Sequence, residues 1–255
     1  MISFTSVQID AWFAAYFWPF VRILALFSSA PLLYHKAIPH RLKIAFAAIA
    51  TLLIAPSLPP ASGEPGWLMV QQLLVGLAIG LALQLVFAAF EVAGDLLGLQ
   101  MGLSFASFID PQNSSDTPLI GSFLGLMATL VFLAINGHLM MIAGIAESFR
   151  VIPIGLASGT ATPSAAGLYS IALAGGEMFR VGLHLALPVL ATMLILNLAL
   201  GVLARAAPQL NIFAVGFPAT ILIGLAAFVL IMPLMAPFLE NSLHRGLAAA
   251  FSFGR

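Results

Sequence analysis

The sequence predicts an all-α, membrane-associated protein with about six to seven long apolar helical segments, broken helices and helical hairpins. Three observations support this fold class. Hydrophobic residues make up 62% of the 255 residues and charged residues only 7%, whereas a soluble domain carries roughly 25% charged residues. The apolar residues gather in long blocks, and a membrane-crossing helix needs roughly 20 of them. Prolines, glycines and short polar runs break these blocks or separate them.

The apolar blocks give the order of the expected helices. Six of them cover residues 11–33, 44–58, 67–90, 119–146, 181–204 and 212–239. The second is marginal in length, and a weaker stretch over residues 91–109 is the expected seventh segment. Connectors rich in Pro, Gly, Ser and Asn predict turns, and they cover residues 55–66, 109–118 and 151–167. The N-terminus lacks a positively charged signal-peptide region, so we expect mature sequence from the start.

Breaks and small residues within the blocks favour helices that pack against protein. Prolines fall inside the blocks, and such breaks are tolerated at membrane depth where neighbouring protein satisfies the freed backbone groups. They are Pro19, Pro188, Pro218 and Pro233. Glycines recur four residues apart, which puts them on one helix face and lets another backbone approach closely. The longest such ladder is Gly94, Gly98 and Gly102, and shorter pairs are Gly76 with Gly80 and Gly121 with Gly125.

Charges give an orientation for the first helices only. Residues 34–43 contain Lys36, Arg41 and Lys43, so the positive-inside rule places this loop in the cytoplasm. The next loop has Glu64 and no basic residue, which fits the outer side. Later charges do not alternate, and we expect them to serve protein contacts as well as topology.

Enzymatic chemistry has little support in the sequence. The chain has no cysteine, which excludes disulfides, cysteine-ligated zinc and thiol catalysis. No HExxH pair, GxSxG elbow or Walker loop is present. The net charge of zero gives no case for nucleic acid. We therefore expect no enzyme, no cofactor and no metal site, and we interpret His138 as a hydrogen-bonded group in a helix interface rather than a proton relay.

Glu91 and Asp95 are the acids most open to a functional interpretation. They lie one helical turn apart and share a face. Acids in an apolar setting can bind cations or relay protons. They can equally line an aqueous lumen or contact a basic partner. The sequence leaves these alternatives open.

A polar junction separates the last two apolar blocks and predicts the tip of a helical hairpin. Arg205 ends one helix, where a cation complements the helix dipole. Pro208 breaks the chain, and Gln209 and Asn211 supply hydrogen-bonding side chains at the turn. We expect this tip to sit at an aqueous or subunit-contact face.

Several motifs in order resemble the FliR family, the flagellar members of the FliR/SctT export-gate subunits of bacterial type III secretion systems. The motifs are "AYFWPFVRILALFSSAPLL", "AIPHRLKIAFA", "GLQMGLSFASFIDPQ", "FLAINGHLMMI" and "APQLNIFAVGFP". The similarity covers about residues 5–240. The resemblance implies one export-gate subunit domain over residues 1–255, with residues 241–255 as a variable tail.

The resemblance also implies partners and a place in the cell. A family member assembles with FliP-like and FliQ-like subunits into a helical gate, near an FlhB-like subunit, and unfolded flagellar proteins pass through that gate. The expected location is the bacterial inner membrane at the flagellar basal body, in contact with lipid, with the assembled gate largely above the membrane plane. No nucleic acid is implied.

By the same resemblance, the loop after "GLQMGLSF" corresponds to the channel plug. It covers about residues 106–119, and its candidate residues are Phe108, Ile109, Asp110, Pro111, Gln112, Asn113, Ser114, Ser115 and Asp116. Two apolar side chains precede a wettable, proline-bounded remainder. The alternative for this stretch is a plain exposed loop.

Two other functions stay open. One is a secondary transporter with discontinuous helices and Glu91 or Asp95 as its ion-coupling site. No internal repeat is detectable, whereas many such folds have one. The other is an intramembrane enzyme, which lacks any nucleophile–base or metal set.

Overall fold

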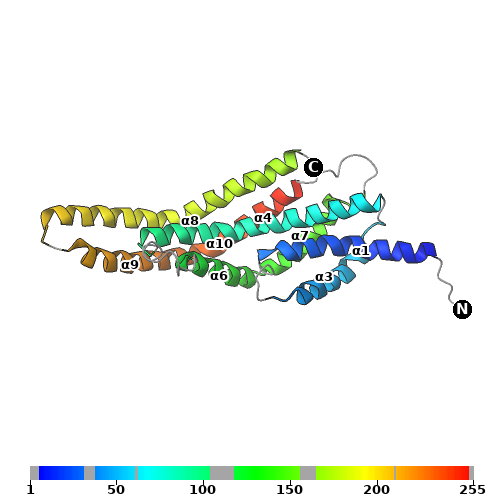
Figure 1. Cartoon of the computed structure of the whole chain (residues 1–255), viewed down its shortest axis with the longest axis horizontal. Helices are drawn as coiled ribbons and strands as arrows, with labels where there is room; N and C mark the ends of the chain where they lie inside the picture. The colour runs from blue at the N-terminus through cyan, green and yellow to red at the C-terminus, as the bar shows by residue number, and fades with distance from the viewer. Residues whose placement is uncertain are drawn as a thin grey trace, which may run out of the picture. The chain divides into compact units, whose positions relative to one another are not determined.

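Most of the part of the chain that the structure describes is helical (Figure 1). The structure is a computed structural model, and it describes residues 6–31, 38–60, 63–103, 118–155, 165–209 and 211–252. No strand occurs within these ranges. The predicted all-α fold class is confirmed.

The α-helices follow the order of the apolar blocks. They are α1 (Ser6–Ser29), α3 (His40–Ile54), α4 (Pro65–Gln100), α6 (Leu119–Ala134), α7 (Gly137–Val151), α8 (Ala165–Ala206), α9 (Ile212–Ile231) and α10 (Met235–Phe251). Two short 3₁₀ helices, η1 (Ala55–Ser57) and η2 (Met232–Leu234), extend α3 and separate α9 from α10. Both begin beside a proline, whose ring fits a first turn but not a helix interior.

Several helix boundaries differ from the predicted segments. Residues 67–90 and 91–109 were expected as two segments, but α4 continues through Glu91 and Asp95 as one helix of 36 residues. Their carboxylates can lie on the helix surface, so they do not interrupt it. The block over residues 119–146 divides instead, because Asn136 adopts the left-handed conformation with φ 57°. The tail after residue 240 is helical as far as Phe251.

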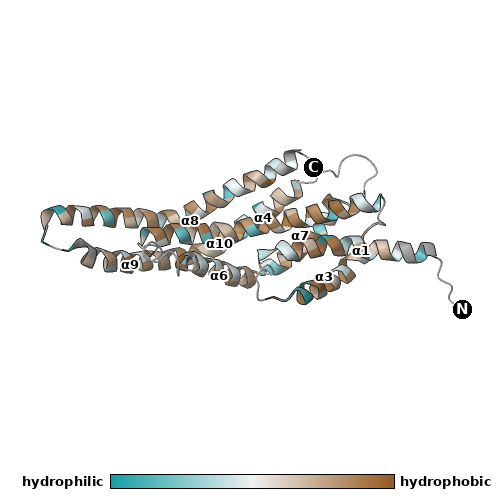
Figure 2. Ribbon diagram, viewed as in Figure 1, coloured by the Kyte–Doolittle hydropathy of each residue, from teal (hydrophilic) through white to brown (hydrophobic). Residues whose placement is uncertain are grey.

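The helices are long and apolar enough for a membrane protein. Among the described residues, five helical stretches could cross a bilayer by length and composition, or six if the broken pair α6 and α7 is one span. In Figure 2 apolar residues run along α4, α8 and α9 with few polar interruptions. A membrane location therefore fits both the composition and the helices.

The contacts within the chain form two compact units. Unit 1 contains residues 1–86, 136–175 and 243–255, and unit 2 contains residues 87–135 and 176–242. Whether the chain acts as the predicted single domain stays a prediction.

Close helix packing builds unit 1. A Cβ atom added at Gly76 would meet the Arg22 carbonyl oxygen and lie 2.7 Å from Ala25 Cβ, and one at Gly80 would meet Ser29. Both glycines therefore let α4 approach α1 closely, as the small-residue spacing predicts. The earlier glycine of α4 contacts earlier residues of α1, and the later glycine contacts Ser29. The two helices, α1 and α4, therefore run in the same direction.

Unit 2 has its own apolar core. Fully or almost fully buried side chains come from α4, α6, α8 and α10, and they are Phe90, Leu97, Leu124, Val189, Met193 and Leu239. Phe87 and Phe132 meet edge to face with ring centroids 5.4 Å apart, a favourable aromatic geometry. A Cβ at Gly182 would lie 2.7 Å from the Ala89 carbonyl oxygen, so α8 packs directly on the α4 backbone.

Candidate functional site

The C-terminal part of α4 packs closely on α6 in unit 2. A Cβ atom at Gly94 would lie 2.6 Å from Gly121 Cα and 2.6 Å from the Ile120 carbonyl oxygen. Real side chains do not approach so closely, so only glycine at position 94 allows this contact. In the sequence, α4 precedes the predicted plug and α6 follows it. This contact fixes the two helices against each other.

The other two glycines of the predicted ladder have different places. A Cβ at Gly98 would lie 3.8 Å from Ile120 Cβ, which is ordinary van der Waals contact. Gly102 has φ 78° and ends α4, because Leu103 N–H donates to the Gly98 carbonyl and Gly102 N–H to the Leu99 carbonyl. This is a Schellman cap, which favours glycine. Packing of the ladder against a partner chain stays a prediction.

Glu91 and Asp95 lie against the glycines of α6. A Cβ at Gly121 would overlap the Asp95 carboxylate oxygen Oδ1, and one at Gly125 would lie 3.1 Å from Glu91 Oε1. The absence of side chains on this α6 face makes room for both carboxylates. Neither acid forms an ion pair with a basic side chain in the part of the chain that the structure describes. A role as lumen acids, as a coupling site or as a contact for a basic partner stays a prediction.

The predicted plug lies outside the described residues. Phe108, Ile109, Asp110, Pro111, Gln112, Asn113, Ser114, Ser115 and Asp116 all fall between the described ranges 63–103 and 118–155. The described boundaries are the Gly102 cap of α4 and Pro118, which is the N-cap residue of α6. The segment therefore connects two helices that are in contact through Gly94.

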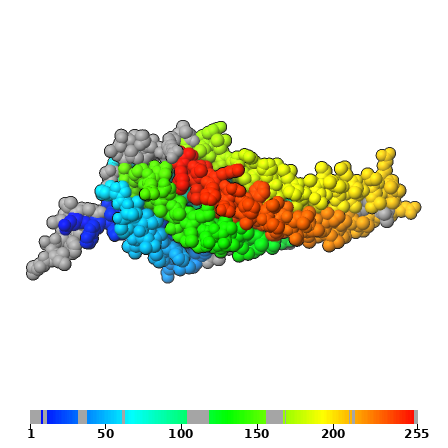
Figure 3. All heavy atoms as spheres, turned by 180° about the vertical axis from the view of Figure 1, so that it is seen from behind, coloured from blue at the N-terminus to red at the C-terminus, as the bar shows by residue number. Residues whose placement is uncertain are grey.

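The polar junction forms the predicted hairpin tip. Arg205 lies in the last turn of α8, and Arg205, Pro208, Gln209 and Asn211 are all exposed. Asn211 precedes α9, and its Oδ1 accepts a hydrogen bond of 3.3 Å from Ala214 N–H, the usual N-cap arrangement. Figures 1 and 3 show α9 beside the second part of α8. What the tip contacts stays a prediction.

The apolar surface of this hairpin is extensive. Large apolar side chains of α8 and α9 are exposed, among them Leu194, Ile195, Leu198, Val202, Leu222, Val229 and Leu230. Only 22% of the residues over Tyr169–Ala206 are buried, compared with 61% over Pro65–Gln100. Water would disfavour such a surface, so lipid or other protein must cover it.

A buried arginine in unit 1 was missed by the sequence analysis. Arg22 is 0% exposed, and its guanidinium donates to Gln72 Oε1 at 2.7 Å, to the Ser148 carbonyl at 3.0 Å and to the Ile152 carbonyl at 2.8 Å. It also lies 4.2 Å from the centre of the Phe149 ring. Its partners are neutral, and two of them are the carbonyls that end α7. The negative end of that helix therefore compensates the charge.

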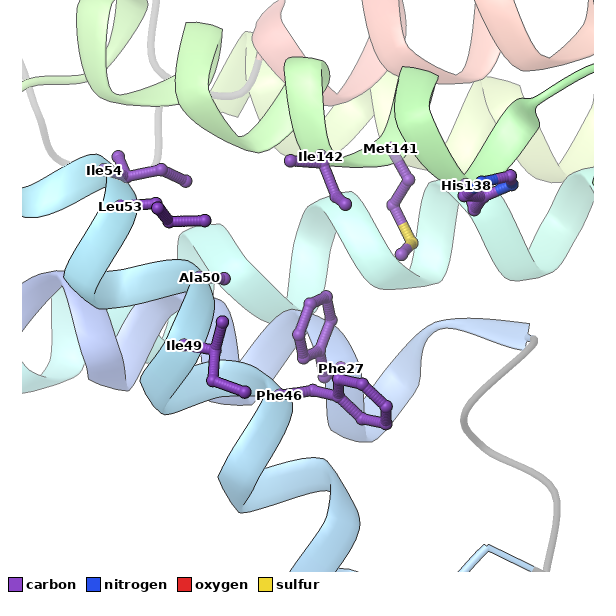
Figure 4. A pocket seen from close by; sticks show the side chains of 9 residues that line it. All are labelled: Phe27, Phe46, Ile49, Ala50, Leu53, Ile54, His138, Met141 and Ile142. Atoms are coloured by element: carbon purple, nitrogen blue, oxygen red, sulfur yellow. The ribbon is translucent and has the colours of Figure 1, made fainter.

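An apolar cavity of about 300 Å³ lies between α1, α3 and α7 of unit 1 (Figure 4). In Figure 4 Met141 and Ile142 of α7 point toward Phe27 of α1, and His138 of α7 and Phe46 of α3 also line this space. His138 Nδ1 is buried and has no hydrogen-bond partner within the described part of the chain. The expectation of a fully hydrogen-bonded His138 was therefore wrong, because its neighbours here are apolar.

Comparison with known proteins identifies the family. Residues 13–246 match the family described as "Bacterial export proteins, family 1". The chain is 46% identical over 247 residues to the "Flagellar biosynthetic protein FliR" of Pectobacterium carotovorum subsp. carotovorum, which covers 94% of this chain and 93% of that protein. The proteins of the same name from Escherichia coli (strain K12) and Bacillus subtilis (strain 168) are 45% and 34% identical, over 94% and 90% of this chain.

The chain belongs to the FliR family of bacterial export proteins. The resemblance inferred from the motifs is confirmed. The match includes the α4–α6 contact, the hairpin tip and Arg22, all within residues 13–246. The names of the family and of these FliR relatives describe export and flagellar biosynthesis and no catalytic activity.

Proposed function

We propose that the chain is a non-enzymatic structural subunit of the flagellar type III protein export gate. In this role it assembles with FliP-like and FliQ-like subunits, and with an FlhB-like subunit nearby, in the bacterial inner membrane at the flagellar basal body. Unfolded flagellar proteins cross the membrane through the assembly, and the energy comes from elsewhere. Membership of the FliR family carries this proposal.

The exposed apolar surface of α8 and α9 supports an assembled state. Side chains such as Leu198 and Leu230 are 63% and 76% exposed, and they extend over helices that bury few of their residues within the chain. Subunit contacts would cover part of this surface. Under the proposal, the segment over residues 106–119 closes the resting channel, and the α4–α6 contact through Gly94 holds both of its ends.

Copurification tests the assembled state. The chain is coexpressed with FliP-like and FliQ-like subunits, extracted in mild detergent and separated by size. A gate subunit should elute in a large complex with both partners, and Leu198→Arg should release it from them while circular dichroism still reports a helical protein. A secondary transporter would elute alone or as a small homo-oligomer. Wild-type chain that never copurifies with either partner would overturn the proposal.

A further inference from the structure

A second cavity in unit 1 combines an apolar floor with the amine of a mostly buried lysine. It has a volume of about 390 Å³ and lies between α1, α3 and α4. Apolar side chains form most of its lining, and they are Val21, Leu24, Ala25, Ile44, Met69 and Leu73. The polar residues of its lining are Ser28, His40 and Lys43. This second cavity differs from the one in Figure 4, whose lining has no lysine or arginine.

Lys43 is the unusual member of the lining. Lys43 as a whole is only 7% exposed. It lies on the buried face of α3 together with Ala47 and Thr51. Thr51 Oγ1 donates to the Ala47 carbonyl, whereas the Lys43 amine has no hydrogen bond or ion pair with any described residue. The amine is not among the fully buried polar atoms of the described residues, so it opens onto the cavity without a partner. An anion in the cavity would supply the partner that this amine lacks among the described residues.

The start of α3 adds further donors beside Lys43. Pro39 is the N-cap residue and makes no side-chain cap hydrogen bond, so no side chain caps the first N–H groups of α3. Such N–H groups and the positive end of the helix dipole favour a phosphate. His40 lines the cavity at this same end of α3. The donors of the α3 start and the Lys43 amine therefore gather at one end of the cavity.

The polar and apolar parts of the cavity lie at opposite ends. Ser28 lies near the end of α1 and His40 at the start of α3, and both line this cavity. Met69 and Leu73 come before Gly76, the α4 residue that meets α1 at Ala25. Since α1 and α4 run in the same direction, these two apolar residues lie toward the beginning of α1, away from Ser28.

We propose that this cavity binds an anionic phospholipid, with its phosphate at Lys43 and the start of α3 and an acyl chain along the apolar floor. A free phosphate would use the donors but not the floor, and a neutral hydrocarbon would use the floor but not the amine. The basic loop over residues 34–43 is expected on the cytoplasmic side. Anionic lipids of that leaflet attract basic segments, which favours an anionic over a neutral headgroup at Lys43. This site is independent of the proposed export function.

Native mass spectrometry of the full chain in mild detergent tests the site. Dioleoyl phosphatidylglycerol and dioleoyl phosphatidylcholine are titrated separately, and wild type should retain the anionic lipid preferentially. Lys43→Gln should weaken that binding about tenfold, as expected for a hydrogen bond to a charged group. Arg41→Gln removes the same charge from an exposed position and should change it less than about twofold. Equal losses in both variants, or equal retention of the two lipids, would overturn the proposal.

Two further arms separate the lipid from other occupants. Leu73→Trp fills the floor and should reduce anionic lipid binding, whereas Leu53→Trp fills the cavity of Figure 4 and should not. Circular dichroism verifies that each variant is folded. Soluble glycerol phosphate should not displace the lipid at millimolar concentration. Displacement by glycerol phosphate would assign the site to a free phosphate, and unchanged binding in Leu73→Trp would remove the acyl chain from the cavity; either result contradicts the proposal.

Discussion

Replacing Arg22 with methionine should destabilise the chain, because the arginine donates hydrogen bonds to buried acceptors on α4 and at the end of α7. Methionine keeps much of the volume but has no donor. The Ile152 carbonyl at the end of α7 and Gln72 Oε1 would then remain buried without their present donor. The Ser148 carbonyl would keep the bond from Ile152 N–H at 2.9 Å.

The expected loss is about 2 kcal/mol. Each buried acceptor left without a donor costs roughly 1 kcal/mol or more, and the structure leaves two of them after the substitution. Removal of a buried charge recovers part of this cost. The expected loss in the free energy of unfolding therefore stays near the lower bound of about 2 kcal/mol for two acceptors. For a chain of this size about 2 kcal/mol corresponds to a shift in the unfolding midpoint of roughly 4–8 °C.

The assay is thermal unfolding of the full chain in detergent, followed by the helical circular dichroism signal. Arg22→Lys keeps the charge but not the planar fork that reaches separate acceptors, so its midpoint should lie between those of wild type and Arg22→Met. The matched control is Arg150→Met, since Arg150 lies in the last turn of α7, near the acceptors of Arg22, but forms an exposed ion pair at 3.6 Å. That control should cost less than about 0.5 kcal/mol. Equal midpoints for Arg22→Met and Arg150→Met would refute the reasoning.

Three further predictions concern unit 2. Gly94→Ala should lower the unfolding midpoint more than Gly98→Ala, since the added Cβ would lie 2.6 Å from Gly121 Cα in the first case and 3.8 Å from Ile120 Cβ in the second; overpacking costs roughly 1–3 kcal/mol, and similar midpoints would argue against it. Asn211→Ala should cost about 1 kcal/mol in the same assay by removing the N-cap of α9, and no change would contradict the cap. Glu91→Gln combined with Asp95→Asn should retain some motility, because neither acid has a described basic partner; complete loss of secretion in a normally assembled complex would favour ion coupling.

The sequence was sufficient for the fold class, the motifs and the hairpin, because these depend on local information. Long apolar blocks specify helices, Asn211 and Arg205 mark two helix ends, and the ordered motifs identify the family. Helix boundaries were less predictable. An acid such as Glu91 does not end a helix whose other face is buried, and the break at Asn136 depends on a left-handed backbone that the apolar pattern does not reveal.

The buried polar network could be anticipated only in part. A lone arginine inside an apolar block needs a partner, so Arg22 carried a usable signal that the sequence analysis did not follow. Its acceptors are 50, 126 and 130 residues away in the chain, and only the tertiary fold brings them together. The same limit applies to Lys43, which sequence analysis placed in a cytoplasmic loop and which the fold buries beside a cavity.

The last prediction concerns the proposed plug, residues 106–119. A protein-conducting gate in an energised membrane must stop ions at rest, since moving one unit charge across 100 mV is worth roughly 2.3 kcal/mol. A short apolar constriction formed by Phe108 and Ile109 can block ions by dewetting, and the polar residues that follow can move aside for a substrate. Phe108→Ala, or deletion of residues 112–116, should therefore raise the resting ion conductance of the assembled complex in bilayers without reducing its yield. Arg150→Met, at an exposed position outside the candidate sites, is the control and should leave conductance unchanged. Assembled Phe108→Ala and deletion complexes that are as ion-tight as wild type would show that this segment is not the seal.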